Sequence, residues 1–255
     1  HEIYGVLRLA LKNAVRWGYI SRSVCDVLDA PRVVSREIAP LTLEQAQVLL
    51  ERIREHRLEV LLTMAVITAM RRGELVALRW ADIDFKRKKL LVLHTVDYIP
   101  KYGYVETEPK TKAGKRLIDL PDFLVTMLKQ HRAGLLERQL QLGEQWENRD
   151  LVFPDLKGGY FNPGYLDKLF ARILKEAGIA HMHLHDLRHS AVTILLSMKV
   201  NIKVIQELLG HSDIGITLRV YGHLLPSMQE EVVEKWNEVF GNGEGEEGAS
   251  DEQER

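Results

Sequence analysis

Apolar residues recur at helical spacing, every three or four positions, over most of the first third of the chain. Residues 3–17 place their apolar side chains on one helical face, and residues 43–53 do the same. The second stretch follows Thr42, with Gln45 three positions on, which is the pattern of a capping box at a helix start. Residues 58–70 are nearly all apolar, so we predict a helix there at the centre of the core.

The pattern changes to short, strand-like runs in the middle of the chain. Residues 82–85 and 90–98 predict two strands joined by a basic turn, and residues 105–107 and 116–120 flank a second turn at 112–114. We therefore expect a small antiparallel sheet carried by a helical domain. The predicted fold class is mainly α with a small antiparallel β-sheet, an α+β domain.

Helical spacing returns after the predicted sheet. Capping residues bound several of these stretches: Pro121 opens one helix, Asn162 and Pro163 open another, and Gly210 closes a short one. The predicted helices span residues 121–142, 162–178, 191–198, 202–209, 217–221 and 226–240.

Composition shifts suggest how the chain divides. Apolar residues follow no regular spacing in residues 29–38, which also contain Pro31, and both features are typical of a linker. We expect the end of one domain in residues 1–30, a linker in 31–39, a main domain in 40–240 and a disordered acidic tail in 241–255. The chain opens at His1 without Met, so we expect a fragment of a longer protein.

Bulk composition fits a globular protein but hides an uneven charge. The chain has 255 residues, of which 45% are hydrophobic, and a net charge of −1. Residues 241–255 hold six of the acidic side chains, so the rest carries 34 basic and 30 acidic residues and is mildly basic. Phosphate binding would therefore depend on local placement of charge.

Cys25 is the only cysteine, which excludes an internal disulfide and suits a reducing cytoplasm. No apolar run reaches membrane-spanning length, so we expect no membrane partner.

The candidate chemistry gathers near the end of the chain. His185 and Arg188 stand three apart at the head of an apolar run, His211 follows the helix stop at Gly210, and Tyr221 ends another helical stretch. A phenol can attack phosphorus, fixed cations can stabilise the non-bridging oxygens, and a positioned acid can protonate the leaving oxygen. This set of residues favours cleavage of a phosphodiester by a protein nucleophile.

These motifs resemble those of the tyrosine recombinases, the phage integrase family. The resemblance rests on H-x-x-R, L-G-H and Y-x-H in this order and on the upstream block Thr68–Leu75, and it covers roughly Arg36 to Phe240. A further segment, Pro109–Arg116, resembles the hairpin that carries the catalytic lysine of the family. Ala69 stands where the family usually has Gly, and we expect it to fit an ordinary helix end without loss.

The resemblance implies a role for each matching residue. Tyr221 is the expected nucleophile, Arg71 and Arg188 stabilise the transition state, and Arg71 points inward while Arg72 stays at the surface. Lys110 is the expected acid, with Lys112 as the alternative. His185 exchanges the tyrosine proton, His211 donates to the phosphate, and Glu74 orients an active-site Arg or His. The basic side chains expected to contact DNA are Lys112, Lys115 and Arg116.

The implied function is site-specific cutting and rejoining of double-stranded DNA for integration or excision of a mobile element. The expected partners are DNA, three further copies of the chain in a synaptic tetramer, and a DNA-bending or directionality factor. The expected location is the bacterial cytoplasm, at the nucleoid. No cofactor, ATP or metal is expected. The alternatives are a chromosome-dimer resolvase, a type IB topoisomerase-like strand transferase and a non-catalytic DNA-binding relative. A metallohydrolase using His185 and His189 would need a third ligand.

Overall fold

The computed structural model describes residues 2–31, 40–109, 112–221, 233 and 236–240, and structural statements concern these residues. Chain contacts separate two units, His1–Ala39 and Pro40–Arg255, which are described individually. The expected linker beyond Pro31 and the expected acidic tail lie outside the described residues, as does most of the last predicted helix.

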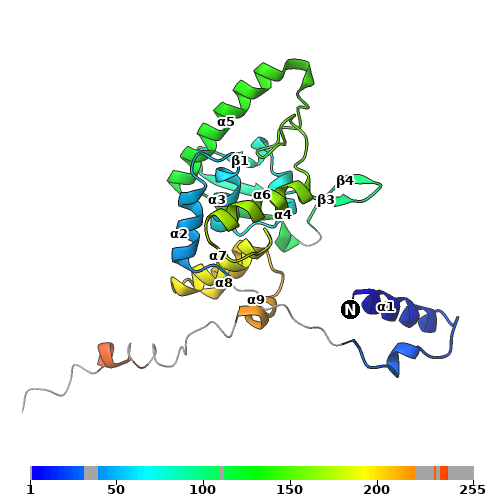
Figure 1. Ribbon diagram of the computed structural model, residues 1–255. Coiled ribbons are helices and arrows are strands. Elements are labelled where there is room, and N and C mark those ends of the chain that lie inside the picture. The colour runs from blue at the N-terminus through cyan, green and yellow to red at the C-terminus, as the bar shows by residue number, and fades with distance from the viewer. Residues whose placement is uncertain (1, 32–39, 110–111, 222–232, 234–235, 241–255) are drawn as a thin grey trace, which may run out of the picture. The chain divides into compact units, whose positions relative to one another are not determined.

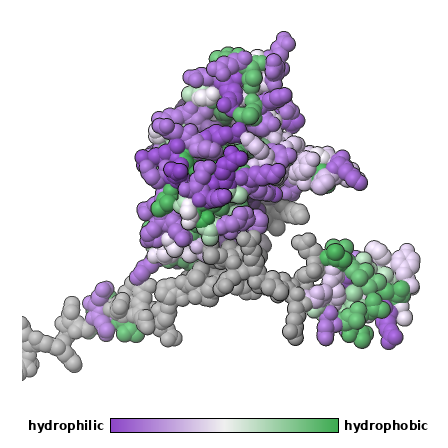
Figure 2. All heavy atoms as spheres, viewed as in Figure 1, coloured by the Kyte–Doolittle hydropathy of each residue, from purple (hydrophilic) through white to green (hydrophobic). Residues whose placement is uncertain are grey.

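The first unit is built around α1 (Glu2–Arg16), which confirms the first predicted helix. A 3-10 turn, η1 (Val24–Asp26), follows it, and the Tyr4 hydroxyl donates a hydrogen bond to the Cys25 carbonyl at 3.2 Å. Apolar side chains of α1 nevertheless stay exposed, and Figure 2 shows hydrophobic surface along this helix.

The second unit opens with the two predicted helices. At the start of α2 (Leu43–Arg52), Thr42 Oγ1 accepts from the Gln45 amide at 3.2 Å, and Gln45 Oε1 accepts from the Thr42 amide at 3.1 Å, so the capping box is confirmed. The next helix, α3 (Glu59–Thr68), is buried along most of its length and packs against α5 and α7 (Figure 1). The predicted central helix is therefore confirmed.

The remaining helices follow the predicted order. Asn162 caps α6 and Gly210 ends α8 in the left-handed conformation, as their sequence positions predict. The bounds are α4 (Arg72–Ala77), η2 (Trp80–Asp82), η3 (Lys112–Gly114), α5 (Asp122–Leu142), η4 (Gly143–Gln145), α6 (Pro163–Glu176), α7 (Asp186–Ser197), α8 (Ile202–Leu209) and α9 (Ile214–Tyr221).

The strands pair differently from the predicted arrangement. The predicted strand 90–98 is divided between β2 (Lys89–Val92) and β3 (Thr95–Ile99), which belong to separate sheets. β3 pairs with β4 (Gly103–Thr107), whereas β2 pairs with β1 (Ile83–Asp84) and with β5 (Arg116–Asp119). The runs expected to flank one hairpin turn therefore lie in two different sheets.

The register of β2 and β5 explains this pairing. Leu90 lies opposite Ile118 and Val92 opposite Arg116, and all four residues are buried. Side chains on a strand alternate between its two faces, so this register places the four on one inner face. Pairing β5 with β4 instead would remove these cross-strand contacts.

The described residues confirm a mainly α fold with small antiparallel sheets, one of three strands and one of two. In Figure 1 the β3–β4 hairpin extends away from the helical body of the second unit, while the other sheet lies within it. Among the helices that the structure describes, none combines the length and the apolar character needed to cross a bilayer.

Candidate active site

Arg71 is held where α4 begins. Its amide donates to Glu74 Oε2 at 2.9 Å, and its Nη1 atom donates to Glu74 Oε1 at 2.8 Å. Gly73 lets this helix start approach β3, because a Cβ at Gly73 would lie 2.8 Å from the Val96 carbonyl oxygen. Glu74 is only 3% exposed, which excludes the surface ion pair that the sequence alone allowed. Glu74 therefore orients Arg71 from inside the protein.

The expected contrast between Arg71 and Arg72 is wrong in one respect. The two side chains are equally exposed, at 40% each. They differ in their partners, since Arg72 Nη1 donates to Asp167 Oδ2 on α6 at 3.0 Å. Both residues line the same cleft, because the extended backbone of Arg71 and the first turn of α4 face one space.

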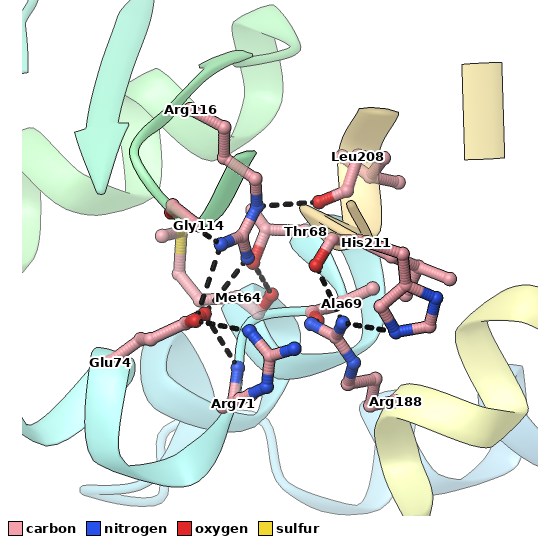
Figure 3. A network of polar contacts seen from close by, with 11 residues as sticks. Met64, Thr68, Ala69, Arg71, Glu74, Gly114, Arg116, Arg188, Leu208 and His211 are labelled. Carbon is pink, nitrogen blue, oxygen red and sulfur yellow. Dashed lines mark hydrogen bonds and ion pairs between the residues drawn. The ribbon is translucent and has the colours of Figure 1, made fainter. Parts of the chain in front are cut away.

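Arg116 is not at a solvated basic tip, which corrects its expected role in contacting DNA. Its guanidinium is 5% exposed and binds the Glu74 carboxylate, with Nη2 to Oε2 at 2.8 Å and Nη1 to Oε1 at 3.2 Å. Its Nε atom donates to the Leu208 carbonyl at 2.6 Å, and Nη1 also reaches the Gly114 carbonyl at 3.3 Å (Figure 3). Arg116 is therefore part of the buried framework that supports Arg71 and the end of α8.

Arg188 joins the end of α3 to the end of α8. Its Nη1 atom donates to the Ala69 carbonyl at 2.7 Å, and its Nη2 atom donates to the Leu209 carbonyl at 2.6 Å. Nη2 also lies 3.2 Å from Nε2 of His211. The Arg188 side chain, on α7, is buried, and it lies on the opposite side of the site from Glu74 in the view of Figure 3.

Ala69 departs from the ordinary helix end that its sequence position suggested. It has φ 51° and ψ 26°, the left-handed region, where a Cβ costs about 1 kcal/mol or more. The helix ends at Thr68, and the left-handed turn aims the Ala69 carbonyl at Arg188. The expectation of an ordinary helix end at Ala69 was therefore wrong.

His211 is fixed through both ring nitrogens. Because an arginine nitrogen can only donate, Nε2 accepts from Arg188. The ring proton is therefore on Nδ1, which donates a hydrogen bond to Thr217 Oγ1 at 2.9 Å. Burial, and with it the positive charges of Arg188, Arg71 and Arg116, lowers the pKa of His211 to about 4. His211 is therefore neutral at neutral pH.

His185 precedes α7 and lines a cleft of about 740 Å³. Arg71, Glu74 and Gly210 also line this cleft. Desolvation lowers the pKa of His185, and the neighbouring His189 and Arg188 add to the shift. Desolvation likewise lowers the pKa of His189. A neutral imidazole at the cleft is able to accept a proton.

The other expected site residues are placed only in part. Lys110 lies outside the described residues. The backbone of Lys112 begins η3 and that of Tyr221 ends α9, while their side chains are not described. Lys115 is exposed and its Nζ atom lies 2.6 Å from Glu108 Oε2. Over the described part of the chain, no group of three or more His, Cys, Asp or Glu side chains is arranged to hold a metal ion.

Two contacts of the site were missed from the sequence. Thr217 contacts His211, and its position four residues before Tyr221, one helical turn away, was the available signal. The buried role of Arg116 follows from strand alternation, because Arg116, Ile118 and Leu120 share one face of a run whose apolar members are buried.

The arrangement gathers cationic and imidazole groups around one opening. Arg71, Arg188 and His211 come from separate elements; Nη2 of Arg188 lies 3.2 Å from Nε2 of His211, and the charge of Arg71 also lowers the pKa of His211. An anion entering there would meet guanidinium groups that the protein has already oriented. The geometry suits binding of a phosphate whose charge increases during reaction.

Comparison with known proteins gives matches along most of the chain. A family model described as "Phage integrase family" matches residues 40–228. A tyrosine recombinase XerC-like protein of Caldanaerobacter subterraneus is 32% identical over 251 residues, which cover 92% of this chain and 64% of that protein. An integrase of Saccharopolyspora erythraea is 26% identical over 292 residues, which cover 94% of this chain and 66% of that protein. The chain thus spans just under two thirds of the length of these relatives.

Solved structures of similar shape support the same fold. A Tn1549 transposon integrase in complex with a circular intermediate DNA superposes with a TM-score of 0.71 at 21% identity, covering 91% of this chain and 78% of that one. The XerA recombinase superposes with a TM-score of 0.56 at 21% identity, covering 93% of this chain and 75% of that one.

Proposed function

This chain belongs to the phage integrase family, and we propose that it is the catalytic part of a site-specific DNA recombinase. It cuts and rejoins DNA strands through a 3′-phosphotyrosyl intermediate, for integration or excision of a mobile element. The observation that carries the proposal is the contact between Arg188 and His211, at 3.2 Å, next to a cleft that Arg71, His185 and Gly210 line.

In the proposed reaction, the Tyr221 hydroxyl attacks the scissile phosphorus and the bond to the 5′ oxygen breaks. His185, neutral because its pKa is lowered, takes the tyrosine proton. Lys110 gives a proton to the leaving 5′ oxygen, with Lys112 as the alternative donor. Arg71 and Arg188 bind the non-bridging oxygens, whose charge grows in the transition state.

His211 changes its role when the phosphate enters. In the free protein its Nε2 atom accepts from Arg188, so it has no proton to give. A phosphate anion raises the pKa of His211, because it stabilises the imidazolium against the nearby arginines. Protonated His211 then donates from Nε2 to a phosphate oxygen, while Nδ1 keeps its bond to Thr217.

The energy of the broken phosphodiester is kept in the phosphotyrosyl bond. A 5′ hydroxyl from a partner strand attacks that bond and restores the tyrosine, so each cut is balanced by one ligation. The reaction therefore needs neither ATP nor a metal ion. The side chain of Lys115 is exposed, and we assign Lys115 and Lys112 to contacts with the phosphates of the DNA backbone.

The proposed organisation extends to the assembly. Residues 1–30 form the end of a core-binding domain, residues 31–39 the linker, residues 40–240 the catalytic domain and residues 241–255 an acidic tail. The exposed apolar face of α1 agrees with a helix that belongs to a larger domain. The working form is a tetramer on double-stranded DNA, with an accessory or directionality factor, in the bacterial cytoplasm at the nucleoid.

The test uses the full-length protein and a DNA duplex carrying a candidate attachment site with a nick near the cleavage position. In EDTA, we expect a covalent protein–DNA band on a denaturing gel. Tyr221→Phe abolishes the band, whereas Tyr102→Phe, an exposed tyrosine on the β3–β4 hairpin, keeps it. A band that survives in Tyr221→Phe, or that requires a divalent metal, contradicts the proposal.

Recombined products separate the alternatives. Exchange between two duplexes distinguishes a recombinase from a type IB topoisomerase-like enzyme, which would relax one duplex without a partner. Specific DNA binding with no covalent band would favour the non-catalytic relative. Use of a chromosomal dimer site in place of a mobile-element end would favour the dimer resolvase.

A further inference from the structure

We propose that Arg116 is a positioning residue that sets Arg71, the η3 segment and the His211 turn in one fixed arrangement. This inference rests on the proposed function, because it assigns Arg116 a part in that reaction without contact to DNA. Arg116 stands at the first position of β5, on the face buried against Val92. From there its guanidinium reaches two segments distant in the sequence and the residues just before β5.

The first link runs to Arg71 through Glu74. Both oxygens of Glu74 accept from Arg116, at 2.8 and 3.2 Å, and both also accept from Arg71, at 2.8 and 2.9 Å. One carboxylate thus lies between two guanidinium groups, which lower the pKa of Glu74 against the opposing effect of its burial. Fixing the Glu74 carboxylate fixes the direction of Arg71.

The second link runs to the His211 turn. Nε of Arg116 donates to the Leu208 carbonyl at 2.6 Å, in the last turn of α8, where carbonyls lack helical partners. Two residues on, Gly210 packs directly against the arginine, since a Cβ there would lie 3.0 Å from Arg116 Cδ. The turn at Gly210, which precedes His211, therefore packs against the Arg116 side chain.

The third link runs to the segment before β5. Nη1 of Arg116 approaches the Gly114 carbonyl at 3.3 Å, and a Cβ at Gly210 would lie 2.7 Å from the Ala113 carbonyl. The end of η3 is thus held against both Arg116 and the His211 turn. This segment begins at Lys112, two positions after Lys110 in the sequence, so its placement bears on the expected proton donor.

The chemistry of the side chain suits this task. Arginine presents several donors in a rigid plane, whereas lysine concentrates its donors on one flexible atom. Burial of an ion pair contributes little net stability compared with apolar residues of similar size. The buried Arg116–Glu74 pair is therefore better explained by the geometry that it imposes than by stability alone.

The experiment compares two variants in the full-length protein. Arg116→Lys keeps the charge and loses the planar fork. The double variant Arg116→Met with Glu74→Gln removes both charges, so no unpaired carboxylate remains buried to unfold the protein. The control is Arg54→Met, which replaces a surface arginine that pairs with the exposed Glu51.

Hydrogen exchange in the DNA-free protein tests the geometry independently of any reaction. We expect faster amide exchange in residues 112–115 and 207–213 of both Arg116 variants, with α3 unchanged and Arg54→Met like the wild type. Unchanged exchange in those two segments overturns the proposal, whether or not the protein cleaves DNA.

Single-turnover cleavage on the nicked duplex tests the consequence for catalysis. We expect the cleavage rate of the Arg116 variants to fall about 100-fold, while DNA affinity changes less than about threefold. A role in stability alone would lower the folded fraction and leave the rate per folded molecule intact, which overturns the proposal. If wild-type protein gives no covalent product, the proposed function fails, and the exchange result still decides the role of Arg116.

Discussion

Nδ1 of His211 lies 2.9 Å from Oγ1 of Thr217, and Thr217 stands one helical turn before Tyr221 on α9. The contact connects the helix that ends at the expected nucleophile to the imidazole that faces Arg188. It also fixes the imidazole tautomer, because Arg188 occupies the other nitrogen as a donor. The position of α9 and the protonation of His211 are thus linked by one hydroxyl.

Thr217→Val, which replaces the hydroxyl by a methyl group, should slow DNA cleavage by about 10- to 100-fold, the usual effect of losing a group that orients an active-site imidazole. Thr217→Ser keeps the hydroxyl and should cleave within about threefold of the wild type. Single-turnover cleavage measures both rates, and ¹⁵N chemical shifts of His211 report the tautomer. Equal rates for the valine and serine variants would show that the hydroxyl does not position His211.

Acid should destabilise the folded protein between about pH 6.5 and pH 4. Burial and the neighbouring Arg188 lower the pKa of His211 to about 4, whereas an unfolded histidine titrates near its ordinary value of 6.5. Within this window the unfolded chain binds a proton that the native chain does not. Stability therefore falls as pH falls, by less than about 1.4 kcal/mol per pH unit because solvent screens this partly exposed group, and His211 contributes no further change below pH 4.

Urea unfolding at several pH values checks this slope. The His211→Gln variant should lose part of it, and His181→Gln, which replaces an exposed histidine, should keep it. Some slope should remain in His211→Gln, because the pKa values of His185 and His189 are lowered too. The same slope in wild type and His211→Gln would mean that the imidazole titrates normally in the folded protein.

Gly210→Ala should cost more stability than Gly178→Ala, although both glycines have a positive φ, of 65° and 68°. At Gly178 nothing lies within 4 Å of an added Cβ, so only the left-handed backbone is penalised, at about 1 kcal/mol. At Gly210 the Cβ would also meet the Ala113 carbonyl at 2.7 Å, which adds about 1–3 kcal/mol of overpacking. Free energies of unfolding in urea measure the difference, and equal losses would contradict the close packing on Arg116.

The parts of the fold that were predicted correctly depend on local signals. The Thr42–Gln45 box spans one helical turn, and the end of α8 is encoded by Gly210 at the next position. The apolar run of α3 predicts its own burial, because no polar face is available to turn toward solvent. Each of these signals lies within a few residues of the structure that it determines.

The incorrect predictions depend on distant partners. Strand pairing is decided by which faces meet, and β5 meets β2 through contacts between residues far apart in the sequence. Strand alternation indicates that Arg116 is buried, but its partner Glu74 lies 42 positions earlier and is brought beside it only by the fold. The left-handed turn at Ala69 is likewise fixed from afar, by Arg188 binding its carbonyl across 119 positions. No local pattern contains these partners.

Ser190→Ala should destabilise the second unit at its very start. The Ser190 hydroxyl accepts from the Leu41 amide at 2.9 Å and donates to the Asp186 carbonyl at 3.0 Å, and both Ser190 and Leu41 are buried. Alanine would leave the Leu41 amide buried without its acceptor, a loss of about 1–3 kcal/mol. Ser197→Ala on the same helix removes only a hydroxyl that donates to the Ile194 carbonyl, so it should cost about 0.5 kcal/mol or less. Urea unfolding followed by tryptophan fluorescence compares the two, and a loss for Ser190→Ala no larger than that for Ser197→Ala would mean that the Leu41 amide finds another acceptor.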